Sequence, residues 1–300
     1  MLLPLLLLLA LGAIWGVSTT IAKVAVTTGM SPIAYGFWQC VIAALLLLSI
    51  SAVRRRWPPI DRRHLFYYVF TGLIGLAIPA LNMYAAVARI PAGLMASIVA
   101  TAPLMTYALA LLARTERFDA LRGLGILVGL GGALMILLPR SSLPTEDMVF
   151  WAAIALATPA LYAVNAVVAG RLMPAADALT LAAGMVTSAA LGFGAGVVIF
   201  GGMTLPWPPD SPAALATFWH GVSSVAAYAL YFQIIRLAGA VYMSQVGYLV
   251  IAIGVAAGMI VFDERHSVWV WLAITAMLVG LTLVNVGQRR LAARSGSRTA

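Results

Sequence analysis

Long apolar runs dominate the pattern of this chain, and short segments with charges, prolines or glycines separate them. A helix that crosses a bilayer needs about 20 mostly apolar residues, which these runs supply. They are continuous and rich in Leu and Ala, unlike the alternating strands of about ten residues that build membrane barrels. The pattern therefore predicts an all-α integral membrane protein with ten transmembrane helices. The predicted spans are 4–26, 32–52, 65–88, 91–112, 119–139, 148–170, 176–201, 213–236, 239–262 and 267–288.

Composition supports a lipid environment. Apolar residues make up 63% of the chain and charged residues only 9%, whereas a soluble domain carries roughly 25% charged residues. A surface this poor in charge would precipitate in water. We therefore expect the lipid bilayer itself to be a partner of the protein.

The placement of the basic residues predicts an orientation in the membrane. With the N-terminus inside, three arginines fall outside, at Arg89, Arg140 and Arg265, and fourteen fall inside. The inside set is Arg54, Arg55, Arg56, Arg62, Arg63, Arg114, Arg117, Arg122, Arg171, Arg236, Arg289, Arg290, Arg294 and Arg298. Such a bias places both termini in the cytoplasm and the protein in the cytoplasmic (inner) membrane. The basic tail suits anionic headgroups, and we expect no nucleic-acid partner, because no stacking aromatics accompany it.

A weak internal repeat relates the two halves of the chain. At an offset of about 147 residues, Trp15 lies over Tyr162 and Tyr84 over Tyr231, and one residue later in register Glu116 lies over Glu264. Each half holds five predicted helices, so the second half must enter the membrane from the opposite side. We expect a first repeat at 1–140, an inverted second repeat at 141–288 and a basic cytoplasmic tail at 289–300. Transporters with inverted repeats bind their substrates near the midplane, between the halves.

The stretches "IWGVSTTIAK", "YAAVARIPAGLMASIVATAPLMTYALALLARTERF" and "GYLVIAIGVAAGMIVFDERH" resemble the two EamA repeats of the drug/metabolite transporter superfamily. The resemblance implies a ten-helix secondary transporter, commonly an exporter of amino acids or other small metabolites. It also implies a central cavity lined mainly by the first, third, fourth, sixth, eighth and ninth helices. Pro103 matches the proline that usually precedes the Glu-Arg turn of the repeat. The second half departs from this pattern, with Val250 or Ile251 near the equivalent place.

Polar and aromatic side chains within the apolar runs are the candidate lining of this cavity, because an unpaired polar group in hydrocarbon is expensive. A pocket with aromatic walls and a few amide or hydroxyl groups suits a small amphipathic solute such as an aromatic or aliphatic amino acid. Two alternatives remain open: Ser and Thr hydroxyls can bond carbonyls of their own helix, and Tyr and Trp can form interfacial belts. The candidates are Trp15, Ser18, Thr19, Asn82, Tyr84, Ser97, Thr101, Tyr162, Asn165, Ser224, Tyr228, Tyr231, Gln245 and Tyr248.

Two titratable residues are candidates for the cavity mouth or for energy coupling. Lys23, the only lysine, lies about three residues from the outer end of the first span, some 5 Å along the helix, so its ammonium can reach water. It serves either the outer mouth or simple anchoring. His220 lies about seven residues into the eighth span, where it either titrates in the cavity or faces a water-filled vestibule.

Energy coupling by buried carboxylates is not indicated, because no Asp or Glu falls at the centre of a predicted helix. The chain also lacks the Gly-rich Lys-Ser/Thr signature of ATP-binding loops. These features favour facilitated diffusion, exchange or weak coupling, with a proton-coupled exporter of drugs or other metabolites as the alternative.

An intramembrane enzyme is the remote alternative. Its one conceivable catalytic pair, Ser224 with His220, lacks an oxyanion site and a third group. We therefore expect a non-enzyme with no catalytic residue, no metal site and no cofactor. Its partner would be a small-molecule substrate, an amino acid or another metabolite. The glycine pair of "GILVG" at 125–129 could serve internal packing or a dimer face, so monomer and homodimer both stay open.

Overall fold

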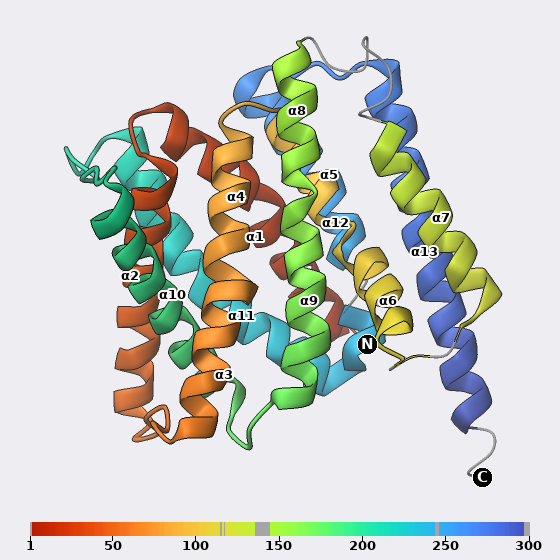
Figure 1. The fold of residues 1–300 in the computed structure, drawn as a ribbon, viewed down its shortest axis with the longest axis horizontal. Helices are drawn as coiled ribbons and strands as arrows, with labels where there is room; N and C mark the ends of the chain where they lie inside the picture. The colour runs from red at the N-terminus through yellow and green to blue at the C-terminus, as the bar shows by residue number, and fades with distance from the viewer. Residues whose placement is uncertain (1, 115, 117, 136–144, 244–245, 297–300) are drawn as a thin grey trace.

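The computed structural model describes the chain except for residues 1, 115, 117, 136–144, 244–245 and 297–300, and every regular element in the described part is helical. By length and composition, seven described helical stretches can cross a membrane, while α7 and α12 are apolar but shorter. The elements, drawn in Figure 1, are α1 (Leu2–Thr27), α2 (Pro32–Val53), α3 (Arg62–Gly72), the π-helical turn η1 (Leu73–Ala77), α4 (Ile78–Val87), α5 (Ala92–Val99), α6 (Ala102–Leu112), α7 (Ala120–Met135), α8 (Glu146–Ala155), α9 (Ala157–Leu172), α10 (Ala178–Phe200), α11 (Pro212–Met243), α12 (Val246–Phe262) and α13 (Val268–Gly296).

Prolines account for the places where long apolar runs are divided. Proline has no N–H to donate and its ring displaces the preceding turn, so a helix bends or breaks just before it. The turn η1 ends two residues before Pro79, α5 gives way to α6 just before Pro103, and α8 gives way to α9 just before Pro159. In contrast, α12 has no proline and runs without a break. The departure at Val250 and Ile251 therefore corresponds to an unkinked helix.

The predicted boundary between the eighth and ninth spans is wrong. The sequence suggested that one span ends at Arg236 and the next begins at 239, but α11 continues to Met243 and α12 begins at Val246. The stretch 237–243 contains no proline and is mostly apolar, so nothing in it stops the helix. A single arginine does not end a helix, because its side chain is a good helix former.

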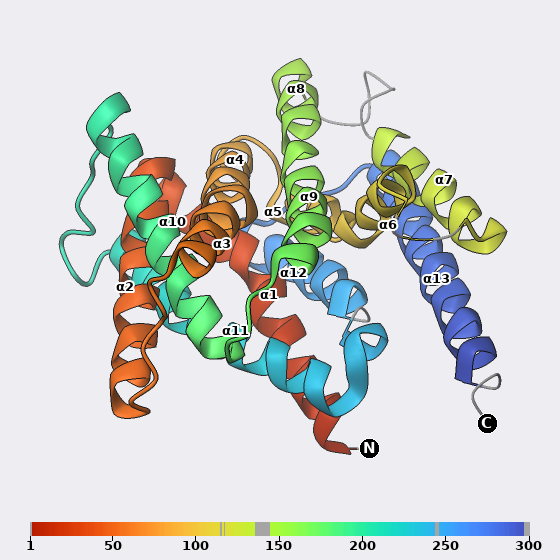
Figure 2. The ribbon, with the colours of Figure 1, turned by 60° about the horizontal axis from the view of Figure 1, so that its bottom comes forward.

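Helices far apart in sequence pack in the interior. Helix α1 lies against α11 and α12, α9 lies against α4 and α6, and α2 pairs with α10. At the far side of the bundle α7 pairs with α13 (Figures 1 and 2). A Cβ atom on Gly280 of α13 would lie 2.4 Å from the Cα atom of Gly129, and one on Gly125 would lie 2.7 Å from the carbonyl oxygen of Gly280. The glycines of 125–129 therefore serve packing within the chain.

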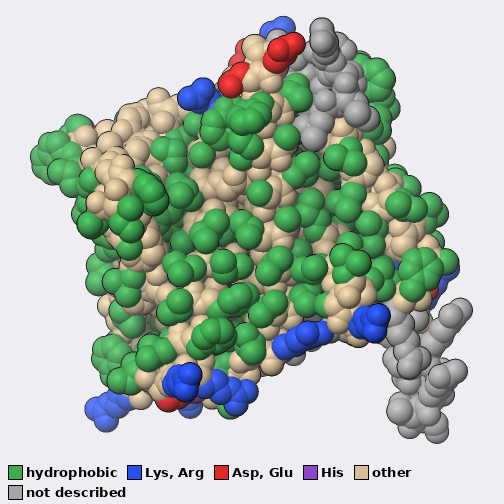
Figure 3. Space-filling model, in the orientation of Figure 1, with side chains coloured by type: hydrophobic (Ala, Val, Ile, Leu, Met, Phe, Trp, Pro, Cys, Tyr) green, Lys and Arg blue, Asp and Glu red, His purple; other side chains and the backbone are tan. Residues whose placement is uncertain are grey.

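Charged side chains gather at one end of the bundle. Arg54 at the end of α2 pairs with Asp177 before α10 (3.1 Å), and Arg171 of α9 donates to the carbonyl oxygen of Ala113 after α6 (3.2 Å). In Figure 3 the blue side chains lie mostly along this lower edge, which we call the arginine-rich end. The acidic first turn of α8, with Glu146 and Asp147, marks the opposite end.

Candidate functional site

A buried aromatic cluster forms where α2, α4 and α11 pack together. The hydroxyl of Tyr35 hydrogen-bonds Nδ1 of His220, and the Tyr35 ring meets that of Tyr84 edge to face, with centroids 4.7 Å apart. Tyr84 is 2% exposed and His220 8% exposed. The imidazole therefore lies among tyrosines and not at a water-filled vestibule.

Further predicted residues adjoin this cluster. Tyr228 packs against the buried cluster that contains Tyr35, Cys40 and Tyr84, and Tyr162 lies on α9, which packs against α4. The fold thus brings together His220 and four of the predicted lining residues, from three helices. These four residues are Tyr84, Tyr162, Ser224 and Tyr228.

The structure adds two residues that the sequence analysis missed, Tyr35 and Gln39. Gln39 is buried, donates to Sγ of Cys40 (3.0 Å) and lies 3.5 Å from the hydroxyl of Ser224. An amide in an apolar run was a usable signal, by the same rule that selected Asn165. Tyr35 carried no such signal, because a tyrosine in the first turn of a span is typical of an interfacial belt.

The serine–histidine pair considered for an enzyme is not formed. The hydroxyl of Ser224 donates to the backbone carbonyl oxygen of His220 (2.8 Å), while the imidazole bonds Tyr35. Ser224 therefore has no base in the described structure.

Asn165 of α9 has the most suggestive environment of the predicted residues. It packs on Gly75, in the π-helical turn η1, so closely that a Cβ atom there would lie 2.5 Å from both Cγ and Oδ1 of the amide. Oδ1 is buried and has no hydrogen-bond partner in the described part of the chain. Buried polar atoms are nearly always bonded, so an unpaired one requires an explanation such as a ligand. Single π-helical turns inside helices also occur often at functional sites.

The residues of α1 form a second group. The ring centroids of Trp15 and Tyr231 lie 5.8 Å apart. Ser18 donates to the carbonyl oxygen of Trp15 (2.7 Å), as the local alternative allowed. The buried hydroxyl of Thr19 has no partner among the described residues.

Ser97 and Thr101 lie within the helix packing, and their hydroxyls bond their own chain. Ser97 donates to the carbonyl oxygen of Gly93 (2.9 Å), and Thr101 donates to that of Ile98 (2.6 Å). Both are buried, with no donor left for a solute in this state. The local alternative for these residues agrees with the structure.

The remaining lining candidates lie apart from the cluster. The amide of Asn82 joins α4 to α8 and α9, donating to the carbonyl oxygen of Ile154 (3.0 Å) and to Oγ1 of Thr158 (2.8 Å). Tyr248 faces α13, where its hydroxyl donates to Oγ1 of Thr282 (3.1 Å). Gln245 lies outside the described residues.

Lys23 forms a buried ion pair at the end opposite the arginine-rich end. Its Nζ lies 2.7 Å from Oε1 of Glu264, and the two side chains are 16% and 6% exposed. The carboxylate also accepts the backbone N–H groups of Ala92 (2.6 Å) and Gly93 (3.1 Å), at the start of α5. A helix N-terminus carries partial positive charge and stabilises an anion. The contact therefore ties together α1, α5 and the segment after α12.

The burial of Glu264 could not be seen in the sequence, where a charged residue just past a helix is typical of an exposed loop. Asp263 adopts a left-handed backbone conformation (φ 50°), which an aspartate tolerates better than most residues. The chain turns there, and the next side chain points back toward α5. Lys23 accordingly has a specific partner, and its role is more than reaching water.

His266 completes this end. Its side chain is 1% exposed, and its Nε2 lies 4.0 Å from Oε2 of Glu264. Burial lowers the pKa of His266; the Glu264 carboxylate opposes this shift and the Lys23 ammonium adds to it. The folded protein consequently holds this imidazole in its neutral form.

We expect acidification to destabilise the protein through His266. A histidine whose pKa is lower in the folded state binds a proton more readily when unfolded, so stability falls as the pH drops through the ordinary value of 6.5. The thermal midpoint in detergent should be lower at about pH 5.5 than at about pH 7.5. The midpoint of the variant His266→Gln should decrease by a smaller amount over the same pH range. Equal losses in both proteins would show that His266 contributes nothing. Protonation of Asp61 and Asp177, whose pKa values lie below the ordinary 3.8, falls outside this window.

The helices and buried polar side chains together define an integral membrane protein of the multi-pass class. The model of the EamA-like transporter family matches residues 2–138, so the N-terminal part of the chain is similar to that family. A solved structure titled "Crystal structure of protein" shares the fold, with a TM-score of 0.65 over 95% of this chain and 97% of that chain, at 17% identity. No curated protein matches the sequence. The family whose model matches is described as a family of transporters.

Proposed function

We propose that the protein is a secondary transporter that exports small amphipathic metabolites, first among them aromatic or aliphatic amino acids, by alternating access and without ATP. The observation that carries this proposal is the buried, unpaired Oδ1 of Asn165, next to helices that present a cluster of tyrosines. A carbonyl oxygen accepts hydrogen bonds from an ammonium group. Tyrosine rings offer an apolar wall and an attractive face for a cation.

The substrate class follows from the same groups. An amino acid would place its ammonium at Asn165 and its side chain against Tyr162 and Tyr228. Its carboxylate would accept hydrogen bonds from donors on α1, where Trp15 and the unpaired hydroxyl of Thr19 lie. Export is the direction that the family resemblance implies.

We also propose that all ten predicted segments cross the membrane, as two inverted repeats at 1–140 and 141–288, followed by the basic tail at 289–300. The packing of the helices supports this arrangement. The helices α2 and α10 form the second and seventh segments, and α7 and α13 form the fifth and tenth, so each of these contacting pairs joins equivalent segments of the two halves. The first segment, α1, contacts the eighth and ninth segments, α11 and α12. Its equivalent in the second half, α9, correspondingly contacts α4 of the third segment and α6 of the fourth. The arginine-rich end would face the cytoplasm, with both termini.

In this proposal the ion pair of Lys23 and Glu264 closes the outer end. The repeat places Gly170 at the position that corresponds to Lys23, so no second buried lysine closes the inner end. There Glu116 instead pairs with Arg122 (3.1 Å), whose guanidinium stacks on Tyr107 at 3.5 Å. The two ends are thus held by different contacts, and each must break once in a transport cycle.

Proton-coupled export of drugs or other metabolites is the second candidate, and the burial of Glu264 favours it. Glu264 is a carboxylate buried between the Lys23 ammonium and the N-terminus of α5, and buried carboxylates in membrane proteins often belong to proton pathways.

Uptake into proteoliposomes, screened over amino acids with a drug panel alongside, tests the proposed function. We expect at least one aromatic or aliphatic amino acid to be transported. Transport should persist after an ionophore collapses the proton gradient, provided that a solute gradient remains. Strict dependence on the proton gradient would refute the uncoupled mechanism and support the second candidate. Absence of transport across the amino acid panel would refute the substrate class.

A further inference from the structure

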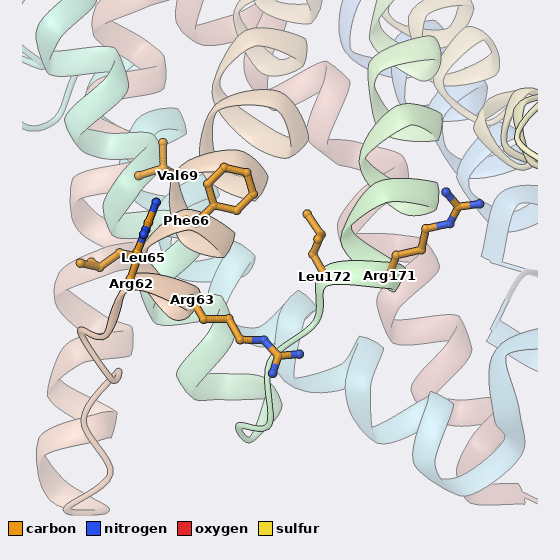
Figure 4. A pocket seen from close by; sticks show the side chains of 7 residues that line it. All are labelled: Arg62, Arg63, Leu65, Phe66, Val69, Arg171 and Leu172. Carbon is orange, nitrogen blue, oxygen red and sulfur yellow. The ribbon is translucent and has the colours of Figure 1, made fainter.

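An open groove of about 970 Å³ lies between α3 and α9 at the arginine-rich end. Its apolar wall consists of Leu65, Phe66 and Val69 from α3 and Leu172 from α9. The three α3 side chains are 46%, 60% and 49% exposed, although they lie in a stretch apolar enough to span a membrane. Figure 4 shows Phe66 and Leu172 pointing toward each other across the groove. In a bilayer this wall would face the hydrocarbon of one leaflet.

Three arginines, Arg62, Arg63 and Arg171, line this groove, and the Arg171 side chain points away from Phe66, on the other side of Leu172. Arg63 reaches across it below the apolar side chains (Figure 4). Arg171 donates one hydrogen bond to the carbonyl oxygen of Ala113. Because a guanidinium has five N–H donors, others are left for a ligand. None of the three has an ion-pair partner among the residues that the structure describes.

The nearby carboxylates do not neutralise these arginines. Asp61 caps α3 and contacts His64. Asp177 pairs with Arg54 and accepts from Thr180. The groove therefore combines uncompensated positive charge at its mouth with an exposed apolar wall beyond it.

We propose that this groove binds an anionic phospholipid, with its phosphate on Arg63, an acyl chain along Phe66 and Leu172, and Arg62 and Arg171 adding positive charge at its sides. Guanidinium groups bind phosphate oxygens in a bidentate geometry that a lysine cannot provide. Basic pockets between transmembrane helices are known to take such headgroups. The site would join α3, which leads into the turn with Gly75, to α9, which carries Asn165. It is separate from the proposed substrate site and does not depend on it.

Binding to the delipidated, purified chain tests this site, with phosphatidylglycerol and phosphatidylcholine compared by native mass spectrometry and by thermal midpoint. We expect retention of phosphatidylglycerol and a higher midpoint than with phosphatidylcholine. The double variant Arg63→Ala/Arg171→Ala should lose about tenfold or more in affinity for phosphatidylglycerol. Its unchanged midpoint in phosphatidylcholine would show that it folds.

The matched control is Arg55→Ala/Arg56→Ala, which removes the same charge from the same end outside the groove. This control should bind phosphatidylglycerol as the unmodified protein does. Equal losses in both double variants would overturn the site, because diffuse surface charge would then explain the binding. Equal retention of phosphatidylcholine would overturn it as well. Inorganic phosphate alone should not raise the midpoint, and a rise equal to that with the lipid would contradict the role of the apolar wall.

Discussion

Replacing Glu264 by glutamine should lower the free energy of unfolding by about 3 kcal/mol, the value expected when one partner of a buried ion pair is removed. The variant removes the negative charge that faces the ammonium of Lys23, which is 16% exposed and lies 4.8 Å from the centroid of the Phe262 ring. It also removes the charge that stabilises the start of α5. Lys23→Met should have a smaller effect, because Glu264 keeps its two backbone donors. Denaturation by SDS in mixed micelles measures both changes.

A second ion pair at the same end provides the control. Arg89 and Asp147 lie 3.8 Å apart, and both side chains are 57% exposed. The variant Asp147→Asn should change the free energy of unfolding by about 1 kcal/mol or less, as exposed pairs do. If Glu264→Gln and Asp147→Asn proved equally mild, Glu264 would not hold the outer end closed.

Replacing Asn165 by alanine should reduce transport about tenfold or more, while the protein stays folded and inserted. A hydrogen bond to a charged group contributes about 1.5–3 kcal/mol, and losing it should raise KM. Because Oδ1 of Asn165 has no partner among the described residues, removing this oxygen breaks no hydrogen bond within the described structure. The thermal midpoint should therefore be unchanged or higher. Tyr228→Ala should also weaken flux, through loss of the aromatic wall.

Gly75→Ala tests the same site from the other side. The added methyl group would collide with the amide of Asn165, so we expect a loss of flux similar to that of Asn165→Ala. Gly131→Ala is the matched control, because a Cβ atom there meets nothing within 4 Å. Normal flux in both Asn165→Ala and Tyr228→Ala would refute the proposal that the substrate binds at these residues. A fall in midpoint with normal KM would make Asn165 a structural residue.

The helical fold is largely predictable from the sequence, because lipid requires long apolar helices and prolines divide them. Pro103 marks the junction of α5 and α6, and unbroken α12 follows from its lack of proline. The end of α11 was not predictable, since charge at Arg236 is a weak stop signal and no proline follows it.

The candidate site could be predicted only in part, because composition does not say which polar groups satisfy one another. Asn165 and Asn82 are equivalent as sequence signals, yet Asn82 spends its donors on α8 and α9, whereas Oδ1 of Asn165 stays unpaired. The pairing of Lys23 with Glu264 spans 241 residues of sequence. Only the fold brings such groups together.

Counterflow in proteoliposomes tests the central claim most directly, with no ATP and no proton gradient present. Vesicles loaded with an unlabelled aromatic or aliphatic amino acid exchange it for an external labelled one only if a single site is exposed alternately to the two sides. We predict transient accumulation of label with the unmodified protein and with Gly131→Ala, and none with Asn165→Ala/Tyr228→Ala. Equal accumulation with the double variant, or none with the unmodified protein, would contradict the account.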